Sequence, residues 1–359
     1  MLRVCSFGEV VIKLVPIDRS VFSSLPSKVN YSYFSSELNF LIDISIFGIK
    51  TYFITAISDN FIGQSILRSF DSFRINRDNV LVSGKGRIGI KYEEEGYGSR
   101  MTSTYCDRAG STIDFFKYHD YDFKEMFSKS TLYHISSNTP AISSDLMNCI
   151  INSIRLAKEM GLEVSLDLSY NLNLWKYTVG HKHVVPEKII NDIAIYCDYL
   201  FCCENDLRQF FGMDIRKKTN NNDIIAHYQN LLLQVSKKFP NVHIISMLIR
   251  NTISNTRENN IGGVLYIRET NQFFFSPNIF NKFEPIAVDS TAFEAGEREA
   301  FYSGLIFGLK KYKGVQQALD FAVSSALLKY THSGDINYSN VNEVNLFRQS
   351  SKFRRMRRV

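Results

Sequence analysis

The sequence predicts an α/β protein with a mostly parallel sheet and helices on both of its faces. The first observation is that short apolar runs alternate with segments of helical periodicity along most of the 359 residues. Such alternation favours parallel strands, because each helix carries the chain back across the sheet before the next strand begins. The second observation is that two consecutive strand-like segments interrupt this rhythm, which predicts a small additional sheet.

The expected elements follow one another in regular order. Helical spacing of apolar residues predicts helices at 37–47, 61–73, 144–160, 187–196 and 223–238. Apolar runs predict strands at 3–15, 51–58, 131–136, 163–168, 199–203 and 242–248. Gly161 directly follows the third helix, where a glycine commonly ends one. A last helix is expected around 300–309, where Gly304 and Gly308 lie one turn apart on a single face.

The interruption lies at 88–94 and 101–106, two alternating segments joined by the turn-forming letters EEGYGS. Together with 10–15, these segments are expected to form a separate sheet that has one polar face and no helix over it. Two interpretations remain open at this point. The sheet is either a lid over a ligand cleft or an edge hairpin packed on the main domain.

Composition narrows the class of protein. Hydrophobic residues make up 45% of the chain and charged residues 22%, as in an ordinary globular protein. The net charge of +6 is local, because five positive charges lie in the final KFRRMRRV and the rest of the chain carries only +1. We therefore expect no nucleic-acid partner. The basic tail is expected to be solvated or to touch an anionic surface.

The six cysteines form no CxxC motif, and most of them fall in apolar segments. Buried reduced thiols are therefore expected, which favours a cytoplasmic protein. No apolar run reaches the roughly 18 residues that a membrane span needs, because Asp43 interrupts the best candidate. Neither a membrane partner nor an N-terminal leader is expected.

Several stretches in colinear order resemble one known family. They are FGEVVIKLVP at 7–16, CDRAGSTI at 106–113, SLDLSYNLNLWK at 165–176 and ALDFAVSSALLKYTHSGDINYSNVNEV at 318–344. Together they resemble the ribokinase (pfkB) family of carbohydrate kinases, and within it most of all the 2-keto-3-deoxygluconate kinases. The resemblance runs from about residue 3 to residue 345.

The resemblance implies a ribokinase-like three-layer α/β/α sandwich with a mostly parallel sheet and a small β-sheet lid. A single domain would span 1–345, with the lid at about 10–36 and 86–112 and a basic tail at 346–359. ATP and Mg²⁺ are the implied cofactors, and a sugar or sugar acid between lid and sheet is the implied small-molecule partner. Lids of this family often pair, so the resemblance also implies a homodimer. Ligands of open α/β sheets bind beyond the carboxyl ends of the strands, which agrees with this arrangement.

In this family a loop of the form GGGDSF closes backbone N–H groups on the moving phosphoryl group, and its aspartate takes the hydroxyl proton. Aligning EAFYSGLIFGL with DSFAAGLIYGL places Glu299 at the aspartate and 296–298 at the three glycines. The resemblance implies that Glu299 is the base and that Gly296 belongs to the catalytic loop. Glu297 adds a negative charge there, which Arg298 offsets if it points inward. The alternative is a solvated first helical turn with acids placed favourably against the dipole.

On the sugar side, the family's GGAEAN corresponds to 34–39, FSSELN. Asn39 is retained, while Phe34 and Ser35 replace the two glycines. The resemblance implies that Asn39 and Ser35 lie against the sugar and that Phe34 fills part of the pocket. Asp167, at a strand end, matches a further substrate-binding position.

Four more positions correspond to the part of the family's site that would hold a substrate carboxylate. Arg108 matches a lid arginine suited to a bidentate carboxylate contact, with a surface lid arginine as the alternative. Asn171 replaces a second carboxylate-binding arginine, and Cys106 replaces a tyrosine. Lys91 stands where a tyrosine is usual and is expected to restore a cation.

On the nucleotide side, CCENDL resembles a segment that organises Mg²⁺ through water. Glu204 would take that role, with an acid at a helix N-terminus as the alternative. Ser246 and Arg250 lie near positions that would contact the nucleotide. His181 and His183 are expected to be surface loop histidines rather than metal ligands, because no third ligand lies at a useful spacing.

Two functions therefore remain open. The first is ATP-dependent phosphorylation of a sugar or keto-deoxy sugar acid, such as 2-keto-3-deoxygluconate, weakened by a degenerate anion hole. The second is a catalytically inactive pseudokinase that binds ligands or regulates. A specificity changed toward a non-acidic sugar lies between them.

Overall fold

The computed structural model describes residues 1–25, 28–96, 100–171, 174–176, 178–179, 182–215, 221–252, 258–279, 282–289 and 296–350. Its helices are α1 (Ser36–Ile46), α2 (Phe61–Ser72), α3 (Phe123–Ser128), α4 (Ser144–Glu159), α5 (Pro186–Ala194), α6 (Glu204–Phe211), α7 (Asn221–Lys238), α8 (Glu297–Lys311), α9 (Val315–Lys329) and α10 (Val341–Gln349). No helix in this part of the chain is long and apolar enough to cross a membrane.

The strands form one large sheet, one small four-stranded sheet and two short hairpins. They are β1 (Arg3–Phe7), β2 (Val11–Pro16), β3 (Val29–Phe34), β4 (Lys50–Ser58), β5 (Ile75–Asn76), β6 (Val80–Ser83), β7 (Gly89–Glu94), β8 (Ser103–Asp107), β9 (Leu132–Ser136), β10 (Glu163–Asp167), β11 (Thr178–Val179), β12 (Lys182–His183), β13 (Tyr199–Cys202), β14 (Ile244–Thr252), β15 (Glu258–Ile267), β16 (Gln272–Ser276), β17 (Asn278–Ile279), β18 (Lys282–Phe283) and β19 (Ile286–Asp289).

The large sheet has the order β16-β15-β14-β13-β10-β9-β1-β4-β5, with β6 beside β4 and β19 beside β15. The neighbouring strands β14, β13, β10, β9, β1 and β4 pair in parallel in this order, and β5 and β6 each pair in parallel with β4. The alternation of strand and helix predicted such parallel pairing. The pairs that β15 makes with β14, β16 and β19 are antiparallel. The carboxyl ends of β1, β9, β10 and β13 therefore meet at one edge of the sheet, where ligands of such folds bind.

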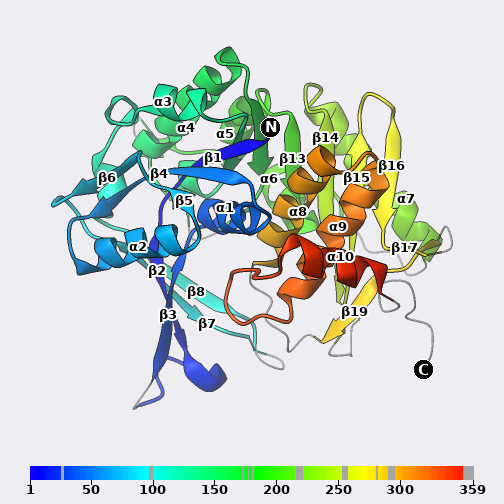
Figure 1. Ribbon diagram of the computed structural model, residues 1–359, viewed down its shortest axis with the longest axis horizontal. Helices are drawn as coiled ribbons and strands as arrows, with labels where there is room; N and C mark the ends of the chain where they lie inside the picture. Colours follow the sequence, from blue (N-terminus) through cyan, green and yellow to red (C-terminus); the bar gives the residue numbers. More distant parts are fainter. Residues whose placement is uncertain are drawn as a thin grey trace.

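Helices cover both faces of this sheet (Figure 1). Apolar side chains of α3, α4, α5 and α7 form the core on one face, and those of α1, α2, α8 and α9 form the core on the other. Local caps fix where several helices begin: Ser35 accepts from the Leu38 amide and Asn60 from the Ile62 and Gly63 amides. Gly161 follows α4 with a φ of 78°, which confirms the predicted cap.

The small sheet has the order β3-β2-β7-β8 and projects from the lower part of the molecule in Figure 1. This confirms the predicted separate sheet and shows that the hairpin is not an edge of the main sheet. Its register sorts the side chains onto two faces. Tyr31, Leu14, Tyr92 and Tyr105 lie across from one another on one face, and the next row carries Lys13 and Lys91 on the other.

One predicted strand was wrong, and several strands were not predicted. The segment 3–15 is two strands rather than one: β1 belongs to the main sheet and β2 to the small sheet, with Gly8 and Glu9 between them. The sequence analysis also did not predict β3, or the antiparallel strands β15, β16 and β19. Helix α10 runs to Gln349, the expected domain end at 345 stays a prediction, and the tail from 351 lies outside the described residues.

Candidate active site

The first turn of α8 lies at the edge of the sheet where the parallel strands end. Gly296 precedes the helix with a φ of 87°, a conformation that L side chains rarely adopt. A Cβ atom at this position would come within 1.9 Å of the Asp335 carbonyl oxygen. The turn around Asp335 can therefore pack this closely against the start of α8 only because residue 296 is a glycine.

Glu299, the residue at the predicted base position, is 9% exposed. Burial raises the pKa of its carboxyl group to about 7, and the nearby charges of Asp167 and Glu297 act in the same direction. Asp43 of α1 is also buried close by, and burial together with Glu299 raises its pKa well above the ordinary value. A carboxyl group that titrates near neutral pH is suited to accept a proton from a substrate hydroxyl.

Glu297 is buried rather than solvated. It is 3% exposed, and its Oε1 atom lies 2.8 Å from Nη1 of Arg250 on β14. The hypothesis of a solvated first turn is therefore wrong. The ion pair also keeps the negative charge of Glu297 beside a cation, which the sequence alone did not show.

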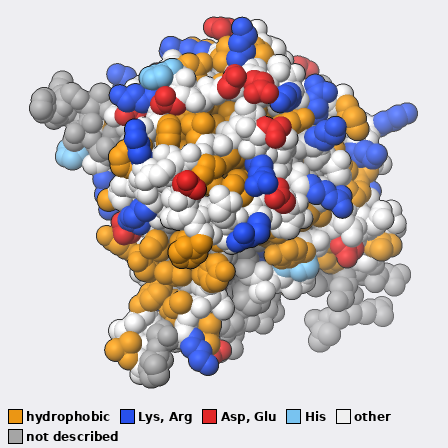
Figure 2. Space-filling view, turned by 60° about the vertical axis from the view of Figure 1, so that its left-hand side comes forward, with side chains coloured by type: hydrophobic (Ala, Val, Ile, Leu, Met, Phe, Trp, Pro, Cys, Tyr) orange, Lys and Arg blue, Asp and Glu red, His pale blue; other side chains and the backbone are white. Residues whose placement is uncertain are grey.

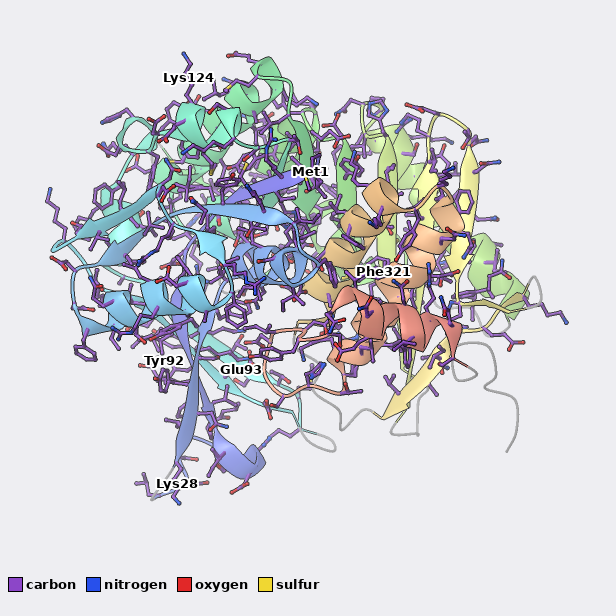
Figure 3. The ribbon with its side chains drawn as sticks, in the orientation of Figure 1. Met1, Lys28, Tyr92, Glu93, Lys124 and Phe321 are labelled. Carbon is purple, nitrogen blue, oxygen red and sulfur yellow. The ribbon has the colours of Figure 1, made fainter. Side chains whose placement is uncertain are left out.

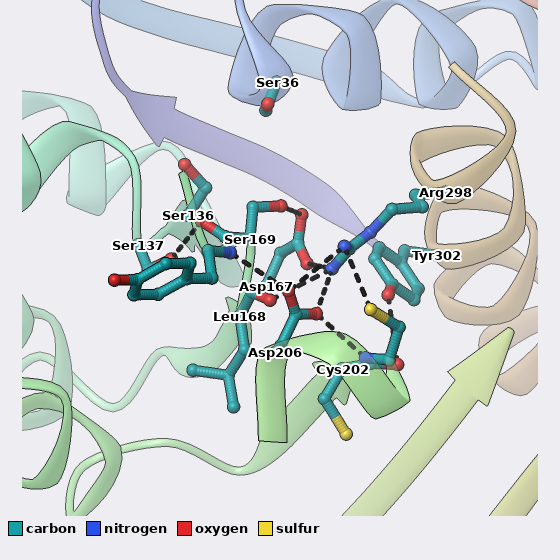
Figure 4. Close-up of polar contacts among 12 residues, drawn as sticks. Ser36, Ser136, Ser137, Asp167, Leu168, Ser169, Cys202, Asp206, Arg298 and Tyr302 are labelled. Carbon is teal, nitrogen blue, oxygen red and sulfur yellow. Dashed lines mark hydrogen bonds and ion pairs between the residues drawn. The ribbon is translucent and has the colours of Figure 1, made fainter. Parts of the chain in front are cut away.

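Arg298 points inward, toward the strand ends (Figure 4). Its Nη2 atom lies 2.8 Å from Asp167 Oδ1, 2.8 Å from Asp206 Oδ2 and 3.1 Å from the Leu168 carbonyl oxygen. Both aspartate side chains are 2% exposed. Burial raises the pKa of Asp167, although the Arg298 charge opposes this. The guanidinium group thus joins α8 to the end of β10 and to the first turn of α6.

Asp206 was not singled out from the sequence. Its carboxylate accepts from the Cys203 and Tyr170 amides as well as from Arg298. The first of these bonds caps α6, and the second holds the chain that follows β10. The signal in the sequence is an acid in the first turn of a helix, which is common at many surface helices and so does not identify a site.

The residues predicted on the sugar side occupy the start of α1. Asn39 is 1% exposed, and both polar atoms of its side-chain amide are without a hydrogen-bond partner in the described structure. Ser35 Oγ donates to Glu37 Oε2, and Glu37 Oε1 also accepts from Ser136 and Thr139. The Ser35 hydroxyl is therefore already hydrogen-bonded within the protein, whereas the Asn39 amide can still form hydrogen bonds with a ligand.

The two predicted carboxylate-binding cations belong to the small sheet, the predicted lid: Lys91 lies on β7 and Arg108 directly follows β8. Arg108 pairs with Glu9 through a short contact from Nη1, and its side chain is 15% exposed, so it is not a surface arginine. Lys91 Nζ lies 2.7 Å from Glu93 Oε2 and 4.2 Å from the centre of the Phe34 ring. Phe34 is thus covered by the lid cation that faces it.

The predicted nucleotide residues do not form one group. Glu204 begins α6 and lies 3.2 Å from His227 Nε2. Arg250 pairs with Glu297, which brings it to the start of α8. Ser246 is fully buried inside β14 and donates to the Val264 carbonyl oxygen, so the prediction that it contacts a nucleotide is not supported: the sheet covers its hydroxyl.

Two buried lysines near α8 were also missed. Lys13 Nζ lies 2.6 Å from Glu93 Oε1 and 2.9 Å from Asp335 Oδ1, which links the lid to the turn beneath Gly296. Lys329, at the end of α9, is fully buried and donates to the His332 carbonyl oxygen. Burial lowers the pKa of Lys329. Long-range pairs of this kind leave no periodic signal in a sequence.

The histidines and cysteines were expected to bind no metal and to carry reduced thiols. Among the described residues, no group of three or more His, Cys, Asp and Glu side chains could hold a metal ion. His183 is exposed on β12, and His181 lies outside the described residues. All six cysteines are free and four are buried, in agreement with the expected reduced thiols.

Comparisons with known proteins identify the family. The model of the pfkB family of carbohydrate kinases matches residues 1–247. The chain therefore belongs to the pfkB family of carbohydrate kinases. A 2-dehydro-3-deoxygalactonokinase of Haloferax volcanii is 21% identical over 339 residues, which are 94% of each chain.

Solved structures agree on the fold. A 2-dehydro-3-deoxygluconokinase of Thermotoga maritima superposes with a TM-score of 0.84 at 24% identity, over 98% of this chain and all of the other. A PfkB family carbohydrate kinase of Listeria grayi gives a TM-score of 0.82 at 22% identity, over 97% of this chain and all of the other. The ribokinase-like fold with its separate small sheet is thereby confirmed.

Proposed function

We propose that this protein phosphorylates a small sugar-like acceptor with ATP and that Glu299 is the base. The observation that supports this most directly is the buried Glu299 carboxyl group, whose pKa is about 7, in the first turn of α8. The first backbone N–H groups of a helix have no partner within it, so they are free to face a phosphoryl group. Glu299 would take the proton as the acceptor oxygen bonds to the γ-phosphorus and the bond to the leaving ADP breaks.

The protein supplies no Mg²⁺ site of its own in the described residues. Asp167 and Asp206 are held by Arg298, and Glu204 is paired with His227. We therefore expect Mg²⁺ to enter together with the nucleotide. Arg250 would face the nucleotide from the start of α8, and Gly296 would keep the backbone there close to the phosphates.

The test is ADP formation with ATP, Mg²⁺ and a panel of sugars and sugar acids that includes 2-keto-3-deoxygluconate. Glu299→Gln should lower kcat at least about a hundredfold, because proton transfer to a positioned base contributes that much. Glu125→Gln is the matched control, because Glu125 pairs with Lys129 on the exposed surface of α3. Turnover in Glu299→Gln equal to that of the wild type would refute the assigned base.

A second candidate is a ligand-binding protein without turnover. It is favoured by Glu297 and Arg298, which occupy the predicted cradle and are both held in ion pairs. A rise in melting temperature on addition of ATP and Mg²⁺, without ADP formation for any acceptor, would support this candidate instead.

We further propose that two copies of the chain pair through their lids. We also propose a cytoplasmic location, which the free thiols favour. The lid face of Tyr31 and Tyr105 is apolar, and these two side chains are 65% and 66% exposed. Figure 2 shows apolar side chains gathered on this part of the surface. An exposed aromatic face of this kind is typical of an interface.

A further inference from the structure

Three cations of the small sheet are already paired with carboxylates of the protein: Lys13 on β2, Lys91 on β7 and Arg108 directly after β8. Arg108 pairs with Glu9, whose other oxygen accepts from Ser111. Glu9 follows β1, so this pair joins the lid to the main sheet. A Cβ atom at Gly89 would come within 3.0 Å of Glu9 Oε1, so the lid strand β7 packs directly against this carboxylate.

Lys13 and Lys91 share one carboxylate. Glu93 Oε1 lies 2.6 Å from Lys13 Nζ, and Glu93 Oε2 lies 2.7 Å from Lys91 Nζ. Lys13 reaches on to Asp335 Oδ1, 2.9 Å away. Figure 3 places Glu93 on β7, where the lid meets the main domain. Burial alone would raise the pKa of Glu93, but the two lysines lower it, so the carboxylate keeps its charge.

The charges of Lys13, Lys91 and Arg108 cancel those of Glu9, Glu93 and Asp335, with which they pair. One further cation, Lys329, lies near Asp335, but it is fully buried and donates to the His332 carbonyl oxygen. A substrate carboxylate would therefore have to break an existing ion pair to gain one of the three paired cations. In such an exchange the new ion pair with the substrate replaces an existing ion pair within the protein, so little binding free energy is gained. The exchange also leaves a buried protein carboxylate without its partner.

The unpartnered polar atoms of the same region suit a hydroxyl group instead. Asp335 Oδ2 is buried without a hydrogen-bond partner in the described structure, and it can only accept. Asn39 offers both an acceptor and donors from a side chain that is 1% exposed. A hydroxyl donates to an aspartate oxygen, whereas a carboxylate is repelled by it.

We propose that the acceptor bound between lid and sheet is a neutral polyhydroxy compound rather than a sugar acid, and that Glu9 and Glu93 determine this specificity. The proposal rests on the proposed function in naming the acceptor of that same site. It would distinguish this chain from the 2-dehydro-3-deoxygalactonokinase and the 2-dehydro-3-deoxygluconokinase to which it is similar, because both of those proteins are named after sugar acids.

The experiment compares 2-keto-3-deoxygluconate with 3-deoxyfructose, which differs only in having a hydroxymethyl group in place of the carboxylate. Calorimetry measures both affinities in the presence of Mg²⁺ and a non-hydrolysable ATP analogue. The wild type should bind 3-deoxyfructose at least about tenfold more tightly, since a charge-assisted contact is worth this factor or more.

Glu9→Gln and Glu93→Gln each free a cation in a different part of the region. Each should shift the ratio of the two affinities about tenfold or more toward the acid, and Glu125→Gln should leave it unchanged. Melting temperatures identify a variant that has lost its fold, and the other variant then carries the comparison. Tighter binding of the acid by the wild type, or no binding of 3-deoxyfructose, fructose or ribose, overturns the proposal.

ADP formation separates this inference from the proposed function. Turnover of the acid in preference to the neutral compounds refutes the specificity and leaves the kinase function standing. Binding of the neutral compounds without ADP formation from any acceptor refutes the kinase function and supports the specificity.

Discussion

Replacing Glu299 by glutamine should make the protein more stable at neutral and alkaline pH. The substitution preserves the shape of the side chain and removes its titration. Glu299 faces Asp167 of β10 and the Glu297 and Arg298 side chains of its own helix, and Asp43 of α1 interacts with it across the packed helices. Three of these four neighbours are acids, so the ionised form of Glu299 is unfavourable in the folded state.

The magnitude follows from the pKa of the Glu299 carboxyl group, which rises from 4.5 to about 7 on folding. Between these two values the folded protein keeps a proton that the unfolded chain has released. The free energy of unfolding therefore falls as the pH rises from about 4.5 to about 7 and stays level above that. One pKa unit corresponds to about 1.4 kcal/mol, so the total loss is about 3 kcal/mol.

The measurement is urea unfolding of the wild type and Glu299→Gln at pH 5 and pH 8. Asp43 and Asp167 are present in both proteins, so the difference between wild type and variant reports the titration of Glu299 together with its interaction with these two acids. We expect the difference in free energy of unfolding to move by about 2 to 3 kcal/mol in favour of the variant between pH 5 and pH 8. The same difference at both pH values would refute the assignment of a raised pKa to Glu299.

Three further predictions concern stability and assembly. Arg298→Met should lower the free energy of unfolding by about 3 to 5 kcal/mol at pH 8. The loss should be smaller at pH 5, because burial raises the pKa of Asp167, which can then take up a proton once the arginine is gone; urea unfolding that shows an equal loss at both pH values would contradict this. Gly296→Ala should destabilise far more than Gly161→Ala, since both glycines have a positive φ but only at 296 would the new Cβ meet the Asp335 carbonyl oxygen; equal melting temperatures would contradict the close packing. Tyr31→Glu should lower the sedimentation coefficient from that of a dimer to that of a monomer. Equal sedimentation coefficients for the wild type and the variant would refute pairing through the lid.

Much of the main sheet could be predicted from the sequence, because its parallel strands are apolar runs separated by amphipathic helices. The antiparallel edge could not. Strand β15 pairs with three strands, β14, β16 and β19. It carries Gly262 and Gly263, which allow the Phe283 and Phe301 rings to pack against its backbone. Glycines in a segment weaken the strand signal, so the sequence analysis did not predict this strand.

The candidate site was only partly predictable because its residues pair with partners that lie far away in the sequence. The resemblance located Glu299 and Asn39 by local motifs, and the structure brings both into buried positions near the strand ends. The partners of the altered residues lie far away in the chain: Arg298 is 131 residues from Asp167 and 92 from Asp206. Nothing in the letters EREAF indicates those partners, so the first turn was equally compatible with a solvated helix start.

Glu297 and Arg298 replace two glycines of the family's loop, and their ion pairs determine how this replacement affects stability and phosphate binding at the start of α8. A buried charge left without a partner would cost several kcal/mol, but here each of the two charges is paired, so the start of α8 is stable as it stands. Arg298 and its two aspartates together carry a net charge of −1, because one guanidinium faces two carboxylates. A phosphate that approaches this group is therefore not attracted by Arg298 alone. Any turnover that survives must depend on the cation that arrives with the nucleotide and on Arg250, whose side chain is 36% exposed, rather than on the residue that replaced the third glycine.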